Sequence, residues 1–172
     1  MRIIRDRQVV DDDWIVISGG ADQLPAEGKL IVPLKRWLAQ RETLIARAQG
    51  AELLGVWLDS HEDPAALVDD LHRLSLIAVN FPRFTDGRGY SAAFLLRQRH
   101  GFKGELRAIG DVLRDQLFYL QRVGFNAFAV RDGRDIEDAL KALDDFSESY
   151  QASSDQPVPL FRRRDAAIGK FA

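Results

Sequence analysis

The chain has 172 residues, a formal net charge of −2 and 46% hydrophobic residues, which is ordinary for one folded domain with its own core. This slight negative charge gives no general attraction to nucleic acid or to an anionic membrane surface, so we expect neither as a partner. The chain contains no cysteine, which excludes disulfides, thiol nucleophiles and cysteine-ligated zinc or iron–sulfur sites within it.

Short apolar segments that read as strands recur along the chain. They are bounded by turn residues and are too short for helices. The predicted strands are Trp14–Ile17, Leu30–Val32, Leu53–Leu58, Leu76–Val79, Leu106–Ile109 and Ala127–Val130.

Amphipathic segments with helical spacing lie between these strands. The first carries Leu34, Leu38 and Ile45 and is expected to end at Gly50. The later ones have cap signals at their ends, a side-chain acceptor or first-turn proline at the start and glycine at the stop. We predict a helix after Asp63–Pro64, one over Gly89–His100 ended by Gly101, one capped by Asp111 and ended by Gly124, and one capped by Asp135.

This alternation predicts an α/β fold with a mainly parallel sheet of successive βα units. Because a complete TIM barrel needs ~250 residues, we expect a partial TIM-barrel-like sheet or an open sheet flanked by helices. Exposed sheet edges would make a homodimer plausible. We divide the chain into one domain, residues 1–146, and a polar tail, residues 147–172, that is expected either to run extended over the surface or to be partly disordered. The N-terminus has no apolar core like that of a signal peptide, which favours a cytoplasmic location.

Charged residues gather where the predicted strands run into helices, the edge at which parallel α/β folds bind ligands. Glycines and arginines there favour an anion, a small oxyanion or a nucleotide. Arg107 lies within a strand and needs a partner if it is buried, with Asp111 or Asp59 as candidates; an exposed edge position is the alternative. The predicted ligand-binding residues are Arg83, Asp86, Gly87, Arg88, Gly89, Ser91, Arg107, Asp111 and Arg114.

Catalytic residues are harder to assign. Asp59 and Asp111 could form an acid–base pair, with His61 as a proton shuttle. Capping and solvated positions explain the same residues equally well. Ser91 has no evident base beside it, and no set of residues has the spacing of a metal site. We therefore assign no catalytic residue, no metal and no cofactor.

The segment from Asp86 to Phe128, DGRGYSAAFLLRQRHGFKGELRAIGDVLRDQLFYLQRVGFNAF, resembles the signature of a bacterial family of uncharacterised proteins. That family is described as an oxidoreductase with a part in sulfite reduction, encoded beside assimilatory sulfite reductase. The resemblance extends more loosely over the chain, from the WIVI segment to the closing PLFRRR.

The resemblance implies a pathway, the reduction of sulfate to sulfide for cysteine synthesis. We expect an accessory protein that binds an oxyanion or nucleotide through Arg83, Arg88, Arg107 and Arg114, which must then converge in one pocket. A second expectation is a non-catalytic partner of sulfite reductase or of its electron-donor protein, which needs an exposed apolar patch. A third is a barrel-like lyase or hydrolase, which needs Asp59 and Asp111 in one cavity.

Overall fold

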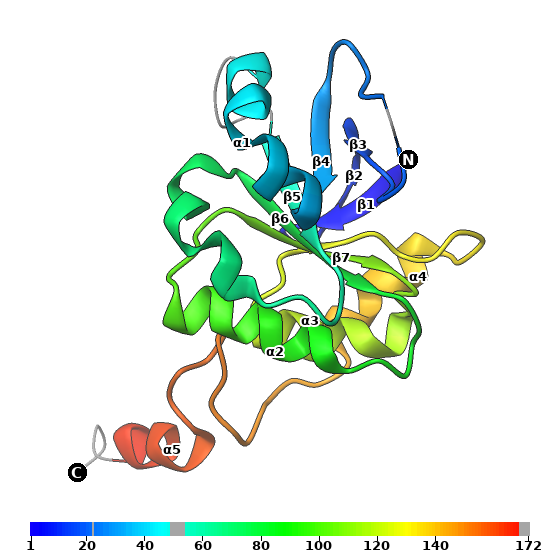
Figure 1. Ribbon diagram of the computed structural model, residues 1–172. Coiled ribbons are helices and arrows are strands. Elements are labelled where there is room, and N and C mark those ends of the chain that lie inside the picture. The colour runs from blue at the N-terminus through cyan, green and yellow to red at the C-terminus, as the bar shows by residue number, and fades with distance from the viewer. Residues whose placement is uncertain (22, 49–53, 169–172) are drawn as a thin grey trace.

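The computed structural model describes residues 1–21, 23–48 and 54–168. Its centre is a sheet of eight strands in the order β2-β1-β8-β7-β6-β5-β4-β3 (Figure 1). The strands are β1 (Arg2–Arg5), β2 (Gln8–Asp11), β3 (Trp14–Val16), β4 (Lys29–Pro33), β5 (Leu54–Leu58), β6 (Leu76–Phe81), β7 (Glu105–Gly110) and β8 (Ala127–Phe128).

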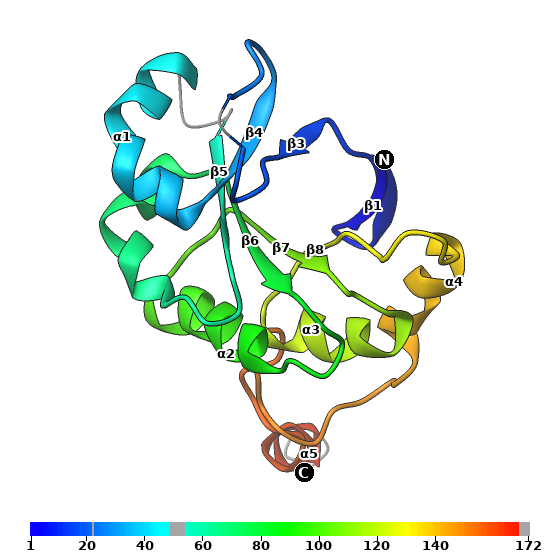
Figure 2. The same cartoon turned by 45° about the vertical axis from the view of Figure 1, so that its right-hand side comes forward.

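Strands β3 to β8 are parallel neighbours, which confirms the predicted series of βα units. Whereas β3 and β4 are joined by a loop, the connecting segments from β4 onward are helical and cover one face of the sheet (Figure 2). They are α1 (Leu34–Ala48), the 3₁₀ helix η2 (Pro64–Arg73), α2 (Arg88–Phe94) with a π-helical turn η3 (Leu95–Arg99), and the 3₁₀ turn η4 (Arg114–Gln116) with α3 (Leu117–Val123). After β8 follow α4 (Ile136–Lys141) and the 3₁₀ turn η5 (Ala142–Asp144).

Most of the predicted caps are confirmed. Asp63 and Asp135 each accept backbone N–H groups at the start of η2 and α4, and Gly101 and Gly124 have positive φ after η3 and α3. The predicted ends at Gly50 and Leu53 lie outside the described residues. Local side-chain chemistry was therefore enough to place these helix ends.

The sheet is mixed rather than purely parallel, because β1 and β2 form a hairpin that pairs antiparallel with β8. The hairpin was not predicted from the sequence. Its turn residues, Asp6 and Arg7, both have positive φ, which suits the two-residue turns of twisted hairpins but is normally signalled by asparagine or glycine. Without that signal the first residues gave no recognisable strand pair.

The two edge strands, β2 and β3, are consecutive in the chain and are joined by Asp12 and Asp13 alone. Three Cα–Cα steps of 3.8 Å separate Asp11 from Trp14, so these residues are at most about 11 Å apart. The sheet must therefore curl until its edges approach each other, and Figure 2 shows the resulting half-barrel. The homodimer stays a prediction.

The main core lies between the convex face of the curled sheet and the helices. Strand residues such as Val56 and Val79 pack there against Trp37 of α1 and Leu96 of η3. The concave face has a smaller apolar cluster of Ile31, Leu76 and Ala78 with Trp57 and Ile109 beside it. Arg107, between outward-facing Leu106 and Ala108, points into this concave side.

The end of the chain differs from the predicted extended tail. Helix α5 (Leu160–Ile168) forms within it and lies apart from the sheet and its helices (Figure 1). We call residues 147–168 the C-terminal arm. No helix of the described residues is long and apolar enough to cross a membrane.

Candidate functional site

The carboxyl ends of β5 to β8 form an edge, here called the strand-end edge, that carries most of the predicted site residues. At the turn before α2, the Asp86 carboxylate accepts from Arg88 Nε at 2.9 Å and from Arg88 Nη2 at 2.7 Å. The Ser60 hydroxyl, which follows β5, donates to the same carboxylate at 2.7 Å and accepts from Arg88 at 2.9 Å. Three residues from two loops thus form one closed polar network.

Arg88, and then Ser60, keep the pKa of the Asp86 carboxyl well below its usual value by donating to it. The carboxylate also accepts from the Arg88 backbone N–H. Asp86 therefore occupies the guanidinium fork and the helix start that an external anion would use. Within this network the chain supplies its own anion.

Of the neighbouring predicted residues, Gly89 has a packing role, whereas the structure shows no particular role for Gly87 and Ser91. A Cβ on Gly89 would lie 2.7 Å from the ring of buried Phe81, so this glycine lets α2 pack on β6. Gly87 is the residue before α2 and has ordinary negative φ. Ser91 is exposed on α2. Anion binding at this turn stays a prediction.

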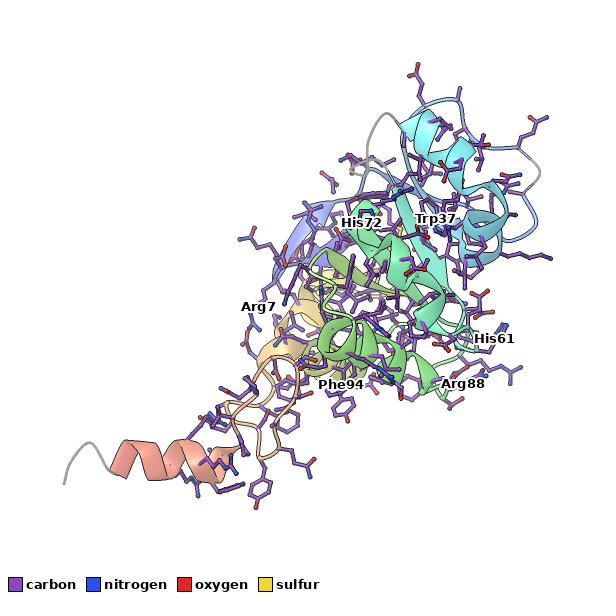
Figure 3. The ribbon with its side chains drawn as sticks, turned by 60° about the vertical axis from the view of Figure 1, so that its left-hand side comes forward. Arg7, Trp37, His61, His72, Arg88 and Phe94 are labelled. Carbon is purple, nitrogen blue, oxygen red and sulfur yellow. The ribbon has the colours of Figure 1, made fainter. Side chains whose placement is uncertain are left out.

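Asp59, at the end of β5, is held by its neighbours. Its Oδ1 accepts from the Ser60 N–H at 2.8 Å and from the Asn80 side-chain amide at 3.1 Å, and Oδ2 lies 3.5 Å from His61 Nδ1. Figure 3 shows His61 and Arg88 at the same end of the molecule. The arrangement orders the loop after β5.

The prediction that Asp111 caps a helix was wrong, because the helical turn after β7 begins only at Arg114. Its carboxylate instead accepts from the Phe84 N–H at 2.9 Å and from Arg131 Nη1 at 2.8 Å. The Phe84 N–H, and then Arg131, lower the pKa of Asp111. The residue therefore joins the loops after β6, β7 and β8.

Gly110 explains why these loops fit so closely. Its φ is +93°, and a Cβ there would lie 2.4 Å from the Phe81 carbonyl oxygen and 2.5 Å from Asn80 Oδ1. Glycine is needed here because it alone tolerates both the backbone conformation and the contact.

Arg107 is buried, with 1% of its side chain exposed, and neither predicted partner, Asp59 or Asp111, contacts it. It makes a bidentate pair with Asp12, at 2.8 and 3.0 Å, and a second pair with Glu105 at 2.6 Å. Arg5 lies 3.8 Å from Glu105. The guanidinium thus holds the link between the two sheet edges against the concave face.

The four arginines predicted to bind an anion do not converge. Arg107 lies on the concave face, and Arg114 pairs with Asp138 at 3.2 Å and Asp145 at 3.0 Å, beside α4. Arg88 is paired with Asp86. Arg83 is exposed and forms no ion pair with any residue that the structure describes. The single four-arginine pocket was therefore a wrong prediction.

The predicted acid–base pair is not supported by geometry either. Asp59 and Asp111 follow β5 and β7, with β6 between them, and five cavities in the described part of the chain are each lined by neither of the two. Both carboxylates accept hydrogen bonds that order loops. Among the described residues, no group of three or more histidine and carboxylate side chains is placed to hold a metal.

The surface that sequence reasoning missed lies over α3 and the C-terminal arm. Tyr119, Phe146 and Tyr150 are exposed to 58%, 64% and 70% and line a cavity of about 450 Å³. Phe94 on neighbouring α2 and Phe161 of α5 are exposed as well, and Figure 3 shows Phe94 at the outer side of its helix. Aromatic residues scattered in a polar tail carry no periodicity, so only the three-dimensional arrangement shows that they gather.

Comparisons with known proteins give a family. Searches of the curated proteins and of the solved structures found no significant match. The family model "Bacterial protein of unknown function (DUF934)" matches residues 55–161, from β5 through the first part of α5, which is more than half of the chain. This chain therefore belongs to that bacterial family, DUF934.

Proposed function

We propose that this protein is an accessory protein of assimilatory sulfite reduction in the cytoplasm, and that it acts without chemistry of its own. In this proposal it docks on sulfite reductase or on the protein that donates electrons to it. The pathway is suggested by the resemblance of Asp86–Phe128 to a family linked with sulfite reduction. The docking role rests on the exposed aromatic surface of the C-terminal arm and α3.

This surface has the composition of a protein-binding site. Soluble monomers rarely expose several large aromatic side chains side by side, and tyrosine and phenylalanine are enriched at interface centres. Phe118 and Phe146 pack at a tilt of 58° with ring centroids 4.9 Å apart, and Tyr119 packs on Tyr90 at the same tilt with centroids 5.3 Å apart. Phe146 and Tyr119 are therefore held by neighbouring rings before a partner arrives, which lowers the entropic cost of binding.

The arm is also anchored at its base. The Ser153 hydroxyl donates to the Arg122 carbonyl at 2.7 Å, and Ser154 donates to the Val123 carbonyl at 3.2 Å, so two carbonyls at the end of α3 find partners there. Arg122, which is buried, donates back to the Gln151 carbonyl. The aromatic surface is thus presented on a defined segment.

The charge of α5 indicates what the partner offers. Arg162 and Arg164 are exposed, while Arg163 pairs with Glu148 at 2.8 Å. Arg162 also lies over the Phe161 ring, 5.8 Å from its centroid. We expect a partner surface that combines apolar side chains with carboxylates.

Growth of a deletion strain tests the pathway. We expect normal growth on sulfide and poor growth on sulfite and sulfate as sole sulfur sources, with recovery when the gene is restored. Equal growth on all three sources would refute the pathway assignment.

Binding of the purified protein to purified sulfite reductase, and separately to its electron donor, tests the docking role. Tyr119→Ser and Phe161→Ser should each weaken binding by roughly 30-fold, the effect of losing about 2 kcal/mol at an interface centre. Leu38→Ser and Val68→Ser are matched controls, because both residues are exposed but lie on α1 and η2. Equal losses in controls and arm variants would contradict docking through the arm.

A second candidate, binding of an oxyanion or nucleotide, is favoured by one observation: Arg83 is exposed and unpaired among the described residues. In that case sulfite, sulfate or adenylyl sulfate should raise the melting temperature, and Arg83→Gln should abolish the effect. No shift with any of the three ligands would eliminate this candidate.

A further inference from the structure

A cavity of about 350 Å³ opens on the concave side of the sheet, at the carboxyl ends of β7 and β8. This is the position at which parallel barrel-like folds bind small ligands, and the volume is within the range of ligand pockets, ~300–1,000 Å³. Apolar side chains of Val16, Ile109 and Ala129 line it. The strand-end edge charges that the sequence emphasised, Asp86 and Arg88, are not among its lining residues.

At the inner end of the cavity, a buried arginine is already paired with carboxylates of the chain. Arg107 lines it, two residues before Ile109 on β7. Asp12 and Glu105 between them contact all three nitrogens of the Arg107 guanidinium. A ligand therefore finds a fixed inner wall there and no free cation.

At the rim of the cavity lies an arginine whose guanidinium still has N–H groups available to a ligand. Arg131 uses Nη1 for Asp111, and its other guanidinium N–H groups have no partner among the described residues. A guanidinium presents five donors in a plane and matches a carboxylate well. Asp132, also at the rim, is exposed and has no ion pair in the described part of the chain.

We propose that this cavity binds a small monocarboxylic acid, with the carboxylate on Arg131 and an apolar body against Val16, Ile109 and Ala129. One partly neutralised arginine is sufficient for a single negative charge. Asp111 and Asp132 lie close enough to oppose a multiply charged anion such as phosphate. The cavity shares no lining residue with the aromatic cavity of the C-terminal arm, so this site is independent of the proposed function.

The probe is 4-methylpentanoate, with its binding to the full chain followed by protein NMR. We expect a Kd on the order of 1 mM and chemical shift changes in the Ile109 and Val16 methyl groups. Arg131→Gln should weaken binding about tenfold or more, as expected for loss of a charged hydrogen bond. Val16→Trp should also weaken it by filling the cavity from an exposed edge position.

Arg134→Gln is the matched control, since Arg134 belongs to the same loop but does not line this cavity; it should leave the affinity unchanged. The neutral isostere 4-methylpentan-1-ol should bind more weakly, and inorganic phosphate should not compete. The proposal is overturned if 4-methylpentanoate causes no shifts in these methyl groups. It is equally overturned if Arg134→Gln weakens binding as much as Arg131→Gln, or if phosphate displaces the probe.

Discussion

The strand-end edge and the C-terminal arm differ in how fully their groups are satisfied within the chain. At the strand-end edge, Asp86, Asp59 and Asp111 each accept hydrogen bonds from side chains or backbone groups of neighbouring loops. On the arm, Phe146, Tyr150 and Phe161 remain exposed. A region rich in charged residues can thus be mainly structural, while an unremarkable tail carries the unpartnered surface.

The buried ion pair of Arg107 should give the largest effect on stability. Arg107→Ala leaves the Asp12 carboxylate buried without a counter-charge and leaves Glu105 with only the more distant Arg5, so unfolding should become easier by about 3–5 kcal/mol. Urea denaturation measures this. Arg114→Ala removes exposed ion pairs and should cost at most about 1 kcal/mol. If the two variants lost similar amounts of unfolding free energy, burial would not explain a difference between these arginines.

Gly110 should give the next largest effect, since it fixes the contacts between the loops of the strand-end edge. Gly110→Ala adds backbone strain and a Cβ contact with Phe81 and Asn80, and should destabilise the protein by about 3 kcal/mol. Gly133→Ala is the control: its φ is +79° but nothing lies within 4 Å of the added Cβ. It should cost about 1–2 kcal/mol. Equal costs would mean that the contact has no effect.

The Asp86 network should show itself in the pH dependence of stability. The folded-state pKa of Asp86 lies below the ordinary value of 3.8, so its contribution is present above that value and is lost as the pH falls. The difference in melting temperature between the wild type and Asp86→Asn should be largest near neutral pH and should shrink below about pH 4. When the same two proteins also carry Arg88→Gln, the difference in their melting temperatures should depend less on pH. A difference that is constant with pH would contradict this account.

The smallest effect is expected on the C-terminal arm. Tyr150→Ser and Phe161→Ser remove exposed rings, so each should change the free energy of unfolding by no more than about 0.5 kcal/mol. Phe125→Ala, in the buried core, should cost about 3–5 kcal/mol in the same denaturation experiment. Large losses in the arm variants would show that these rings support the fold rather than a partner.

The sequence predicted what depends on neighbours along the chain. Apolar runs placed β4 to β7, and Asp63 and Asp135 marked helix starts through their own side chains. It did not predict the β1–β2 hairpin, whose turn has no glycine or asparagine. Nor could it pair Arg107 with Asp12, which is 95 positions away and becomes a neighbour only because the sheet curls.

Contacts between residues far apart in the sequence also form the aromatic surface and the polar network of the strand-end edge. Asp86 was recognised as a site residue from its glycine-rich turn, but its partner Ser60 belongs to a different loop. Tyr119 and Tyr150 lie on separate segments and form one surface only after Ser153 and Ser154 anchor the arm to α3. Local patterns therefore assigned the partners of these residues poorly, because the partners come from other loops.

The pairing of β1 with β8 also constrains the order of folding. Ile4 lies opposite Phe128 in the register, so β1 can pair with β8 only after the residues up to Phe128 have been synthesised. Contacts of such sequence separation form slowly and leave unpaired strand edges exposed in the meantime. The β1–β2 hairpin therefore cannot join the rest of the sheet until β8 has left the ribosome, and Ile3 and Ile4 stay unburied until then.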